Sequence, residues 1–324
     1  MQLIEAVPNI SEGKDLEVIR RIAQEAVSDN AAKVLHIDSN PDANRTVFTI
    51  AGKPTEVVKA CFKLIASAAR YIDMRHHSGK HPRLGATDVC PLVPLRNISL
   101  LETASYAKEL ALNVATNLQI PVYLYETNSS DPNRKNLAFL RRGEYENLAE
   151  KLQTLPPDFG PREISPLVQK SGATVIGARN VLIAFNISLN TTNLEISKQI
   201  ASRLREKNGG LPGVKTIAWH MPHYGCTQVS CNLIDYHKTS LATLFETCKK
   251  EASAFGITLT GSEIIGLVPQ EALVQAGNYY SPSQHDTHAL IPTAVEHLLL
   301  NHIHPFDTRE KILEDVLRKN QLIS

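Results

Sequence analysis

The sequence predicts an α/β (α+β) chain made of two related halves, each with the order strand, helix, strand, strand, helix, strand. Two repeated motifs support this prediction. Asn-Ile-Ser ends an apolar run at residues 9–11 and again at residues 186–188. A glycine followed by Leu-Val-Pro closes each half, at residues 85–94 and 261–269, and these closing motifs lie 175 or 176 residues apart. We interpret this spacing as an internal duplication rather than as chance.

In the first half, the periodicity of the apolar residues predicts two helices and the strands around them. Apolar residues recur at helical spacing between Leu16 and Val27. Strands are predicted at residues 34–38 and 46–51, because apolar and polar residues alternate in the second of these segments. A second helix is predicted over residues 56–71, and the last strand of this half contains residues 92–94.

The second half repeats the same order of elements. A helix is predicted through Ile196 and Leu204, strands at residues 214–219 and 228–236, and a helix at residues 240–255. This order is typical of a ferredoxin-like βαββαβ unit. A sheet covered by helices on one face needs a partner for its other face. The halves are therefore expected either to pack sheet to sheet or to line a ligand groove between them.

The boundary between the halves is predicted near residue 178, which gives an N-terminal subdomain at 1–178 and a C-terminal subdomain at 179–324. A proline-rich connector at residues 155–161 precedes this boundary. The small residues at 172–179 are expected either to let a ligand approach the backbone closely or to form an ordinary linker.

The chain beyond Asn278 is rich in histidine, and we interpret it as a solvated terminal region. His302 and His304 have the look of a metal-binding pair, but no nearby cysteine or convincing carboxylate completes a site. Asp307 and Glu310 have a spacing that resembles the capping box at the start of a helix.

The composition excludes several classes of function. Basic and acidic residues number 34 and 33, so nothing indicates a nucleic-acid partner. No apolar run reaches the length of a membrane span, and the N-terminus lacks the features of a signal peptide, so a cytoplasmic location is expected. The five scattered cysteines are unlike a disulfide framework. The basic pairs at residues 134–135 and 141–142 are interpreted as solvated surface, with an anionic ligand as the alternative.

The segment at residues 76–88 carries the strongest candidate for chemistry. Gly79 and Pro82 exclude an ordinary helix there, so His81 is expected on a stiff loop among cations. An imidazole in that setting can transfer protons near neutral pH, although a solvated turn is the alternative. Asp38 can orient His81 or stabilise its charge if the fold brings them together, but it also suits a turn.

Other catalytic patterns have little support. His77 and His81 have the spacing of a zinc-binding pair, but the acid after the first histidine is missing and Gly79 breaks the helix. The chain has neither a nucleophile elbow nor a phosphate-binding P-loop.

Five segments, in this order along the chain, resemble glutamate formimidoyltransferases (formiminotransferases) in the form without a cyclodeaminase domain. These segments are residues 5–13, 44–47, 79–91, 121–125 and 172–179. The resemblance covers nearly the whole chain. It implies transfer of the formimino group from N-formimino-L-glutamate to N5 of tetrahydrofolate, which yields 5-formiminotetrahydrofolate and L-glutamate in histidine degradation. It also implies two subdomains with the folate between them, a homodimer, tetrahydrofolate as co-substrate and no metal.

The resemblance also assigns roles to individual residues. It places the catalytic histidine on His81 and its acidic partner on Asp38. The folate-contacting segment falls on residues 160–172, although the stretch 162–171 is longer than the animal pattern. The folate-binding residues are then Gly160, Pro161, Arg162, Glu163, Ile164, Ser165, Pro166, Gly172 and Ala173.

Both substrates carry carboxylates, so nearby cations and one amide are candidates for binding them. These candidates are Asn9, Arg45, Arg83 and Arg179. Three alternatives remain open: formyl transfer from N-formylglutamate or 5-formyltetrahydrofolate, a folate-binding protein without catalysis, and an interaction protein without affinity for folates.

Overall fold

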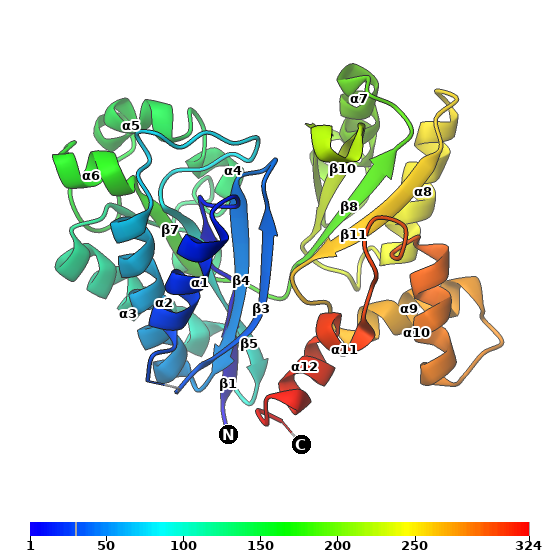
Figure 1. Ribbon diagram of the computed structural model, residues 1–324, viewed down its shortest axis with the longest axis horizontal. Coiled ribbons are helices and arrows are strands. Elements are labelled where there is room, and N and C mark those ends of the chain that lie inside the picture. Colours follow the sequence, from blue (N-terminus) through cyan, green and yellow to red (C-terminus); the bar gives the residue numbers. More distant parts are fainter. Residues whose placement is uncertain (30, 324) are drawn as a thin grey trace. The chain divides into compact units, whose positions relative to one another are not determined.

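The computed structural model describes residues 1–29 and 31–323. The chain divides into two compact units, one that ends at Asn180 and one that begins at Val181 (Figure 1). Each unit contains a β-sheet with helices, and each contains the predicted order of six elements. The prediction of two ferredoxin-like subdomains is therefore confirmed.

The sheet of the first unit is built around an interrupted first strand. Its strands are β1 (Leu3–Ala6), β2 (Asn9–Ile10), β3 (Lys33–Asn40), β4 (Arg45–Gly52), β5 (Thr87–Arg96), β6 (Val122–Leu124) and β7 (Thr174–Ala178). β1 and β2 both lie between β4 and β5, to which they are antiparallel, and β3 pairs with β4. β7 and β6 extend the sheet beyond β5 in parallel. The four strands of the repeat thus have the spatial order second, third, first, fourth.

Three long helices of the first unit bury their apolar faces in one core. They are α1 (Leu16–Ala26), α2 (Pro54–Tyr71) and α3 (Leu100–Leu118). The Asp15 side chain caps α1, and a capping box between Ser99 and Glu102 starts α3. Ile22 of α1 and Leu64 of α2 are fully buried in the same cluster as Phe48 of β4. Even-numbered residues of β4 therefore face these helices, and Arg45 and Val47 lie on the other face of the sheet.

Shorter helices form a second cluster around β5, β6 and β7. They are α4 (Leu137–Leu140), α5 (Leu148–Thr154) and α6 (Pro166–Ser171), with 3-10 turns η1 (Glu126–Asn128) and η2 (Tyr145–Asn147). Leu140, Leu152 and Val168 pack with Val89 and Tyr123 in this cluster. This layer carries the chain from α3 back to the loop that precedes β5.

The interpretation of residues 172–179 as an ordinary linker is wrong, because most of this stretch is the buried strand β7. Val175 and Ile176 are fully buried and pair with β5 and β6. A side chain at Gly177 would place its Cβ 2.3 Å from the carbonyl oxygen of Tyr125. The small residues therefore serve close packing of the chain against itself.

The second unit repeats the topology of the first. Its strands are β8 (Ile183–Leu189), β9 (Val214–Met221), β10 (Cys226–Leu233) and β11 (Leu259–Ile265), and its repeat helices are α7 (Leu194–Leu204) and α8 (Leu241–Ser253). Two further 3-10 turns are η3 (Glu206–Asn208) and η4 (Pro222–Tyr224). The sheet order β11-β8-β10-β9 is antiparallel throughout and again places the second, third, first and fourth strands side by side.

The C-terminal part contributes to the core of the second unit. It forms α9 (Gln270–Tyr280), α10 (Thr287–His297), α11 (Thr308–Lys311) and α12 (Leu313–Lys319). Ala294, Val295 and Ile312 are buried in the second core, so the interpretation as a merely solvated region is wrong. Its histidines are nevertheless exposed, and Asp307 does cap a helix. Among the described residues, no helix has the length and apolar character to cross a membrane.

Candidate active site

The loop between α2 and β5, residues 72–86, is held against the β3–β4 turn by Asn44. The Asn44 amide donates to the carbonyl of Ser78 at 2.7 Å, and its side-chain oxygen accepts from the backbone N–H of Gly13 at 3.0 Å. The Nε2 of His77 donates to the backbone carbonyl of Asn44 at 3.0 Å. A Cβ on Gly79 would lie 2.4 Å from the carbonyl oxygen of Ala43, so the loop needs glycine there.

The end of this loop is held by the end of the predicted folate segment. The Ala86 N–H donates to the carbonyl of Ser171 at 2.7 Å, and the Ala173 N–H donates to the carbonyl of Leu84 at 3.1 Å. Gly85 and Gly172 pair in an antiparallel β-bridge between these two segments. Their backbones approach so closely that a Cβ on Gly172 would lie 2.4 Å from the Cα of Gly85. The structure therefore brings Gly172 and Ala173 to the His81 loop.

His81 is buried and contacts Arg45 directly. Nε2 of His81 lies 2.5 Å from a terminal guanidinium nitrogen of Arg45. A guanidinium can only donate hydrogen bonds, so Nε2 must accept this one. The ring is therefore neutral, with its proton on Nδ1.

The charges around His81 favour this neutral form. Burial lowers the pKa of His81 well below its ordinary value, and the positive charges of Arg45 and Arg141 lower it further, against a backbone hydrogen bond with Pro82. Burial, with the charge of Arg141, lowers the pKa of Arg45 to about 10, while Asp88 and Asp38 act in the opposite direction. The site is thus a desolvated imidazole next to two guanidinium groups.

Asp88 joins the loop to Arg141. Its carboxylate, 1% exposed, accepts from the backbone N–H of Leu84 at 3.0 Å and forms an ion pair with Arg141. The Arg141 side chain is only 15% exposed, so the interpretation of this basic pair as solvated surface is wrong for Arg141. Its partner lies 53 residues earlier in the chain, and Arg142 next to it is exposed, so no local signal singled it out.

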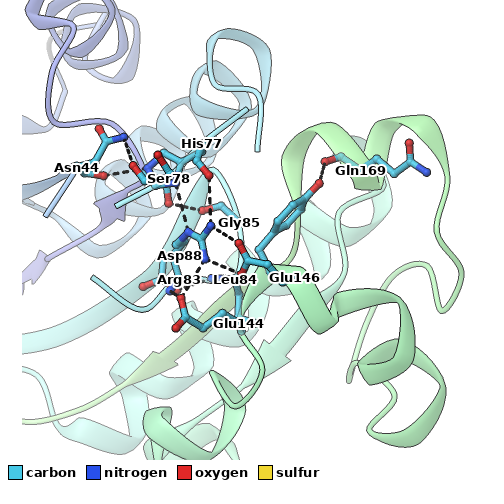
Figure 2. A network of polar contacts seen from close by, with 12 residues as sticks. Asn44, His77, Ser78, Arg83, Leu84, Gly85, Asp88, Glu144, Glu146 and Gln169 are labelled. Atoms are coloured by element: carbon cyan, nitrogen blue, oxygen red, sulfur yellow. Dashed lines mark hydrogen bonds and ion pairs between the residues drawn. The ribbon is translucent and has the colours of Figure 1, made fainter. Parts of the chain in front are cut away.

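Arg83 is the centre of a separate network. Its guanidinium donates to Glu146 at 2.5 and 2.7 Å and to Glu144 at 2.9 Å, and its Nε donates to Nδ1 of His77 at 3.2 Å (Figure 2). These carboxylates raise the pKa of Arg83. Arg83 therefore ties the loop to η2, and it can bind a substrate carboxylate only if one of these pairs opens.

Asp38 lies near Arg45 on the same face of the sheet. It sits in β3 opposite Val47, while Asn40 is opposite Arg45. Its charge raises the pKa of Arg45, so Asp38 acts on the cation that contacts His81.

Asn9 and Arg179 occupy different parts of the first unit. Asn9 is buried in β2, and its amide donates to the carbonyl of Val7 at 2.9 Å. Arg179 follows β7, whose last residue pairs with Leu92. It therefore lies roughly 17 Å from the start of β5 at about 3.3 Å per residue, so a ligand that contacts both Arg179 and Arg45 must be long.

The rest of the predicted folate segment is partly exposed and partly structural. Arg162, Glu163 and Pro166 are exposed. The Ser165 hydroxyl accepts from the Val168 N–H at 3.2 Å and caps α6. Gly160 has φ +90° and lies against the backbone of residue 120, a conformation that favours glycine.

The β3–β4 turn, the loop at residues 72–86 and the strand ends beside them surround one small polar pocket. It is lined by Ser11, Ala43, Asn44, Arg45, His77, His81, Arg83 and Asp88. Among the described residues, no group of three or more histidine, cysteine or acidic side chains is arranged to hold a metal ion. A neutral imidazole beside guanidinium groups can bind an anionic substrate and exchange a proton with it.

Known proteins resemble the chain over both units. The family model "Formiminotransferase domain, N-terminal subdomain" matches residues 3–179, and "Formiminotransferase domain" matches residues 184–318. Glutamate formimidoyltransferase of Thermoplasma acidophilum is 42% identical over 284 residues, which cover 86% of this chain and 92% of that protein. The enzyme of the same name from Streptococcus pyogenes is 40% identical over 281 residues, which cover 86% and 93%.

A longer relative matches as well. Formimidoyltransferase-cyclodeaminase of Rattus norvegicus is 41% identical over 325 residues, which cover 97% of this chain but 59% of that protein. The chain thus spans about three fifths of the length of this relative. The two family models together cover almost the whole chain, and we conclude that it belongs to the formiminotransferase family.

Proposed function

We propose that this protein transfers the formimino group from N-formimino-L-glutamate to N5 of tetrahydrofolate, with His81 as general acid and base. The observation that carries the proposal is the buried imidazole of His81 in contact with Arg45, in a chain of the formiminotransferase family. The relatives named glutamate formimidoyltransferase, at 40–42% identity, support the formimino donor. Tetrahydrofolate, the role in histidine degradation and the catalytic histidine follow from the resemblance.

The proposed reaction needs two proton transfers at nitrogen. N5 of tetrahydrofolate attacks the amidine carbon of the donor, a C–N bond forms, and N5 gives up its proton to Nε2 of His81. The bond from that carbon to the glutamate nitrogen then breaks, and the imidazolium returns the proton to the leaving nitrogen. One imidazole serves both steps if its pKa in the complex lies near the working pH.

Binding of the carboxylates is assigned to cations of the first unit. We propose Arg45 for the donor, with Asp38 stabilising the positive charges of Arg45 and of the imidazolium. Arg179, which lies far along the sheet, suits the acidic tail of the folate, and Asn9 is kept as a polar contact. The segment at residues 160–173 is proposed to contact the folate. Its end is hydrogen-bonded to the His81 loop.

The test is the His81→Ala variant of the purified protein. We expect a folded protein whose rate of 5-formiminotetrahydrofolate formation falls by about a hundredfold or more, as loss of general acid–base catalysis predicts. Circular dichroism and thermal unfolding serve as controls for folding. Near-normal turnover by the folded variant would show that His81 is not the catalytic group.

A parallel assay separates the proposed donor from its alternatives. N-formylglutamate and 5-formyltetrahydrofolate are compared with N-formimino-L-glutamate at equal concentration. Faster consumption of a formyl donor would replace the proposed substrate, and folate binding without turnover would support a binding protein. The homodimer and a folate groove between the subdomains remain predictions from the resemblance, and the cytoplasmic location remains a prediction from the composition and the N-terminal sequence.

A further inference from the structure

The nitrogen that must accept a proton during the proposed reaction is already engaged. Nε2 of His81 accepts a hydrogen bond from Arg45 at 2.5 Å. Its lone pair cannot take a proton from N5 of tetrahydrofolate while this bond persists. The base is therefore masked in this arrangement, and catalysis requires that Arg45 leave Nε2.

The other two arginines of this site form ion pairs with carboxylates. Arg141 is paired with Asp88, and Arg83 is paired with Glu144 and Glu146. Arg45 differs because one of its terminal N–H groups donates to an imidazole. An imidazole accepts a hydrogen bond from a guanidinium more weakly than a carboxylate does. A substrate carboxylate that enters the pocket can thus compete with His81 for Arg45.

We propose that Arg45 is a substrate-operated lock on His81: it donates to Nε2 in the free protein and moves to the α-carboxylate of N-formimino-L-glutamate on binding, which makes Nε2 available as the base. This inference rests on the proposed function, which names the donor and the reaction. It adds a positioning role for Arg45 that couples substrate binding to the protonation chemistry of His81.

The chemistry of the donor selects the α-carboxylate. In N-formimino-L-glutamate the α-carboxylate and the reacting nitrogen are attached to the same carbon atom. Arg45 and His81 are in direct contact, so a carboxylate bound to Arg45 places that nitrogen beside the imidazole. The tail carboxylates of a folate are separated from N5 by the aryl linker and the amide, so they do not meet this condition.

The move of Arg45 to the substrate carboxylate is expected to raise the pKa of His81. The charged and titratable groups around the ring are Arg45 of β4, Asp38 of β3, Asp88 of β5, Arg141 after α4, and His77 and Arg83 of the loop. Pairing Arg45 with a substrate carboxylate moves its positive charge away from the imidazole and adds a negative charge beside it. The pKa of His81 then rises toward neutral pH, where a general base is most effective.

The main test compares the pH dependence of kcat/KM, which reports the free protein, with that of kcat, which reports the complex. Tetrahydrofolate is kept saturating and N-formimino-L-glutamate is varied. For the wild type we expect the acid limb of kcat to lie about one pH unit above that of kcat/KM, the shift typical of one nearby charge. We expect Arg45→Lys to keep this separation. Arg45→Gln should lose it and show a raised KM.

The proposal is wrong if the acid limbs of kcat and kcat/KM coincide in the wild type. It is also wrong if Arg45→Gln keeps the full separation between these two limbs. Either result leaves the proposed function standing, because both require measurable transfer of the formimino group. Complete absence of transfer by the wild type, with folded protein, would instead contradict the proposed function.

A second measurement does not depend on turnover. The ring-proton NMR signal of His81, assigned by its loss in His81→Asn, is titrated with pH in wild-type protein. We expect saturating L-glutamate to raise the midpoint by about one unit. 4-Aminobutyrate, which lacks the α-carboxylate, should leave it unchanged. An equal midpoint with and without L-glutamate overturns the lock, and a shift caused only by 5-formyltetrahydrofolate overturns the choice of the α-carboxylate.

Discussion

The two units share one topology but differ in the segment before the last strand of the repeat. In the first unit, residues 72–86 separate α2 from β5, and in the second only residues 254–258 separate α8 from β11. The long segment carries His77, His81 and Arg83, three of the residues that line the pocket. The pocket is therefore formed by a long loop that only the first unit adds to the shared scaffold.

The polar residues on the two sheets also have different hydrogen-bond partners. The Ser11 hydroxyl of the first unit donates to the carbonyl of Gly85 in the loop at residues 72–86. Ser188 occupies the corresponding position in the second unit, and its hydroxyl accepts from Gln228. Gln228 and Asn186 also donate to Glu263 at 3.0 and 3.2 Å. The first unit therefore concentrates cations around one imidazole, and the second forms a network of amides around one carboxylate.

The largest difference between the units is expected on substitution of the buried carboxylate of Asp88 and the half-buried carboxylate of Glu263. Asp88→Ala leaves Arg141 and the Leu84 N–H without their partner in a buried site, so we expect a loss of about 3–5 kcal/mol in the free energy of unfolding. Glu263→Gln keeps a side-chain oxygen for Asn186 and Gln228, and we expect a loss of about 1 kcal/mol. Urea unfolding measures both changes.

Equal losses of stability in Asp88→Ala and Glu263→Gln would contradict this prediction. A wild-type-like Asp88→Ala would show that Arg141 is well solvated without its partner. The matched variant Asp88→Asn keeps the shape of the side chain, and we expect it to fall between Asp88→Ala and the wild type because it still accepts from Leu84.

Sequence patterns were sufficient for the scaffold because its signals are local. The helix beginning after Asp15 and the strand at residues 46–51 follow from periodicity and capping within a few residues. The repeated Asn-Ile-Ser motif pointed to the shared topology. The strand β7 was missed because small residues in Thr174–Ala178 allow close packing as readily as they allow ligand approach.

The candidate site was only partly predictable, for a physical reason. His81 and Gly79 stand out in sequence because they share a segment with unusual backbone demands. The partners of that segment come from elsewhere: Arg141 reaches Asp88 across 53 residues, and Arg83 reaches Glu146 across 63. Such pairs form only when the fold is complete, so Arg141 looked like any surface arginine.

A smaller difference is expected for alanine at two glycines that both have a positive φ. Gly172 has φ +68° and Gly256 has φ +69°, so alanine is strained at both. A Cβ on Gly172 also meets the Leu84 carbonyl oxygen at 2.3 Å, whereas nothing lies within 4 Å of a Cβ on Gly256. We expect Gly256→Ala to cost about 1 kcal/mol. Gly172→Ala should cost roughly 2–4 kcal/mol, because overpacking adds to the same strain.

The two glycine variants also differ in their expected effect on turnover. Gly172→Ala moves the end of the His81 loop, so kcat should fall together with stability, whereas Gly256→Ala should leave kcat unchanged. Thermal unfolding and initial rates are measured on the same samples. Equal losses of stability for the two variants would mean that the loop relaxes without cost.

The smallest expected effect is a dependence of stability on pH that comes from His81. Its pKa is lowered in the folded protein, so between the unfolded value of about 6.5 and the lower folded value the unfolded chain binds one more proton. Stability due to this residue is therefore present above about pH 6.5. It declines as pH falls, by at most about 1.4 kcal/mol per pH unit.

His81→Asn removes this contribution and keeps a polar side chain of similar size. The free energy of unfolding is measured in urea between pH 5 and pH 8 for the variant and the wild type, and the difference between the two curves isolates His81. His77 also has a lowered pKa through burial, but it is present in both proteins and its contribution cancels. Parallel curves would mean that His81 takes up a proton equally in the folded and unfolded chains, and the desolvated imidazole on which the proton transfer depends would then be absent.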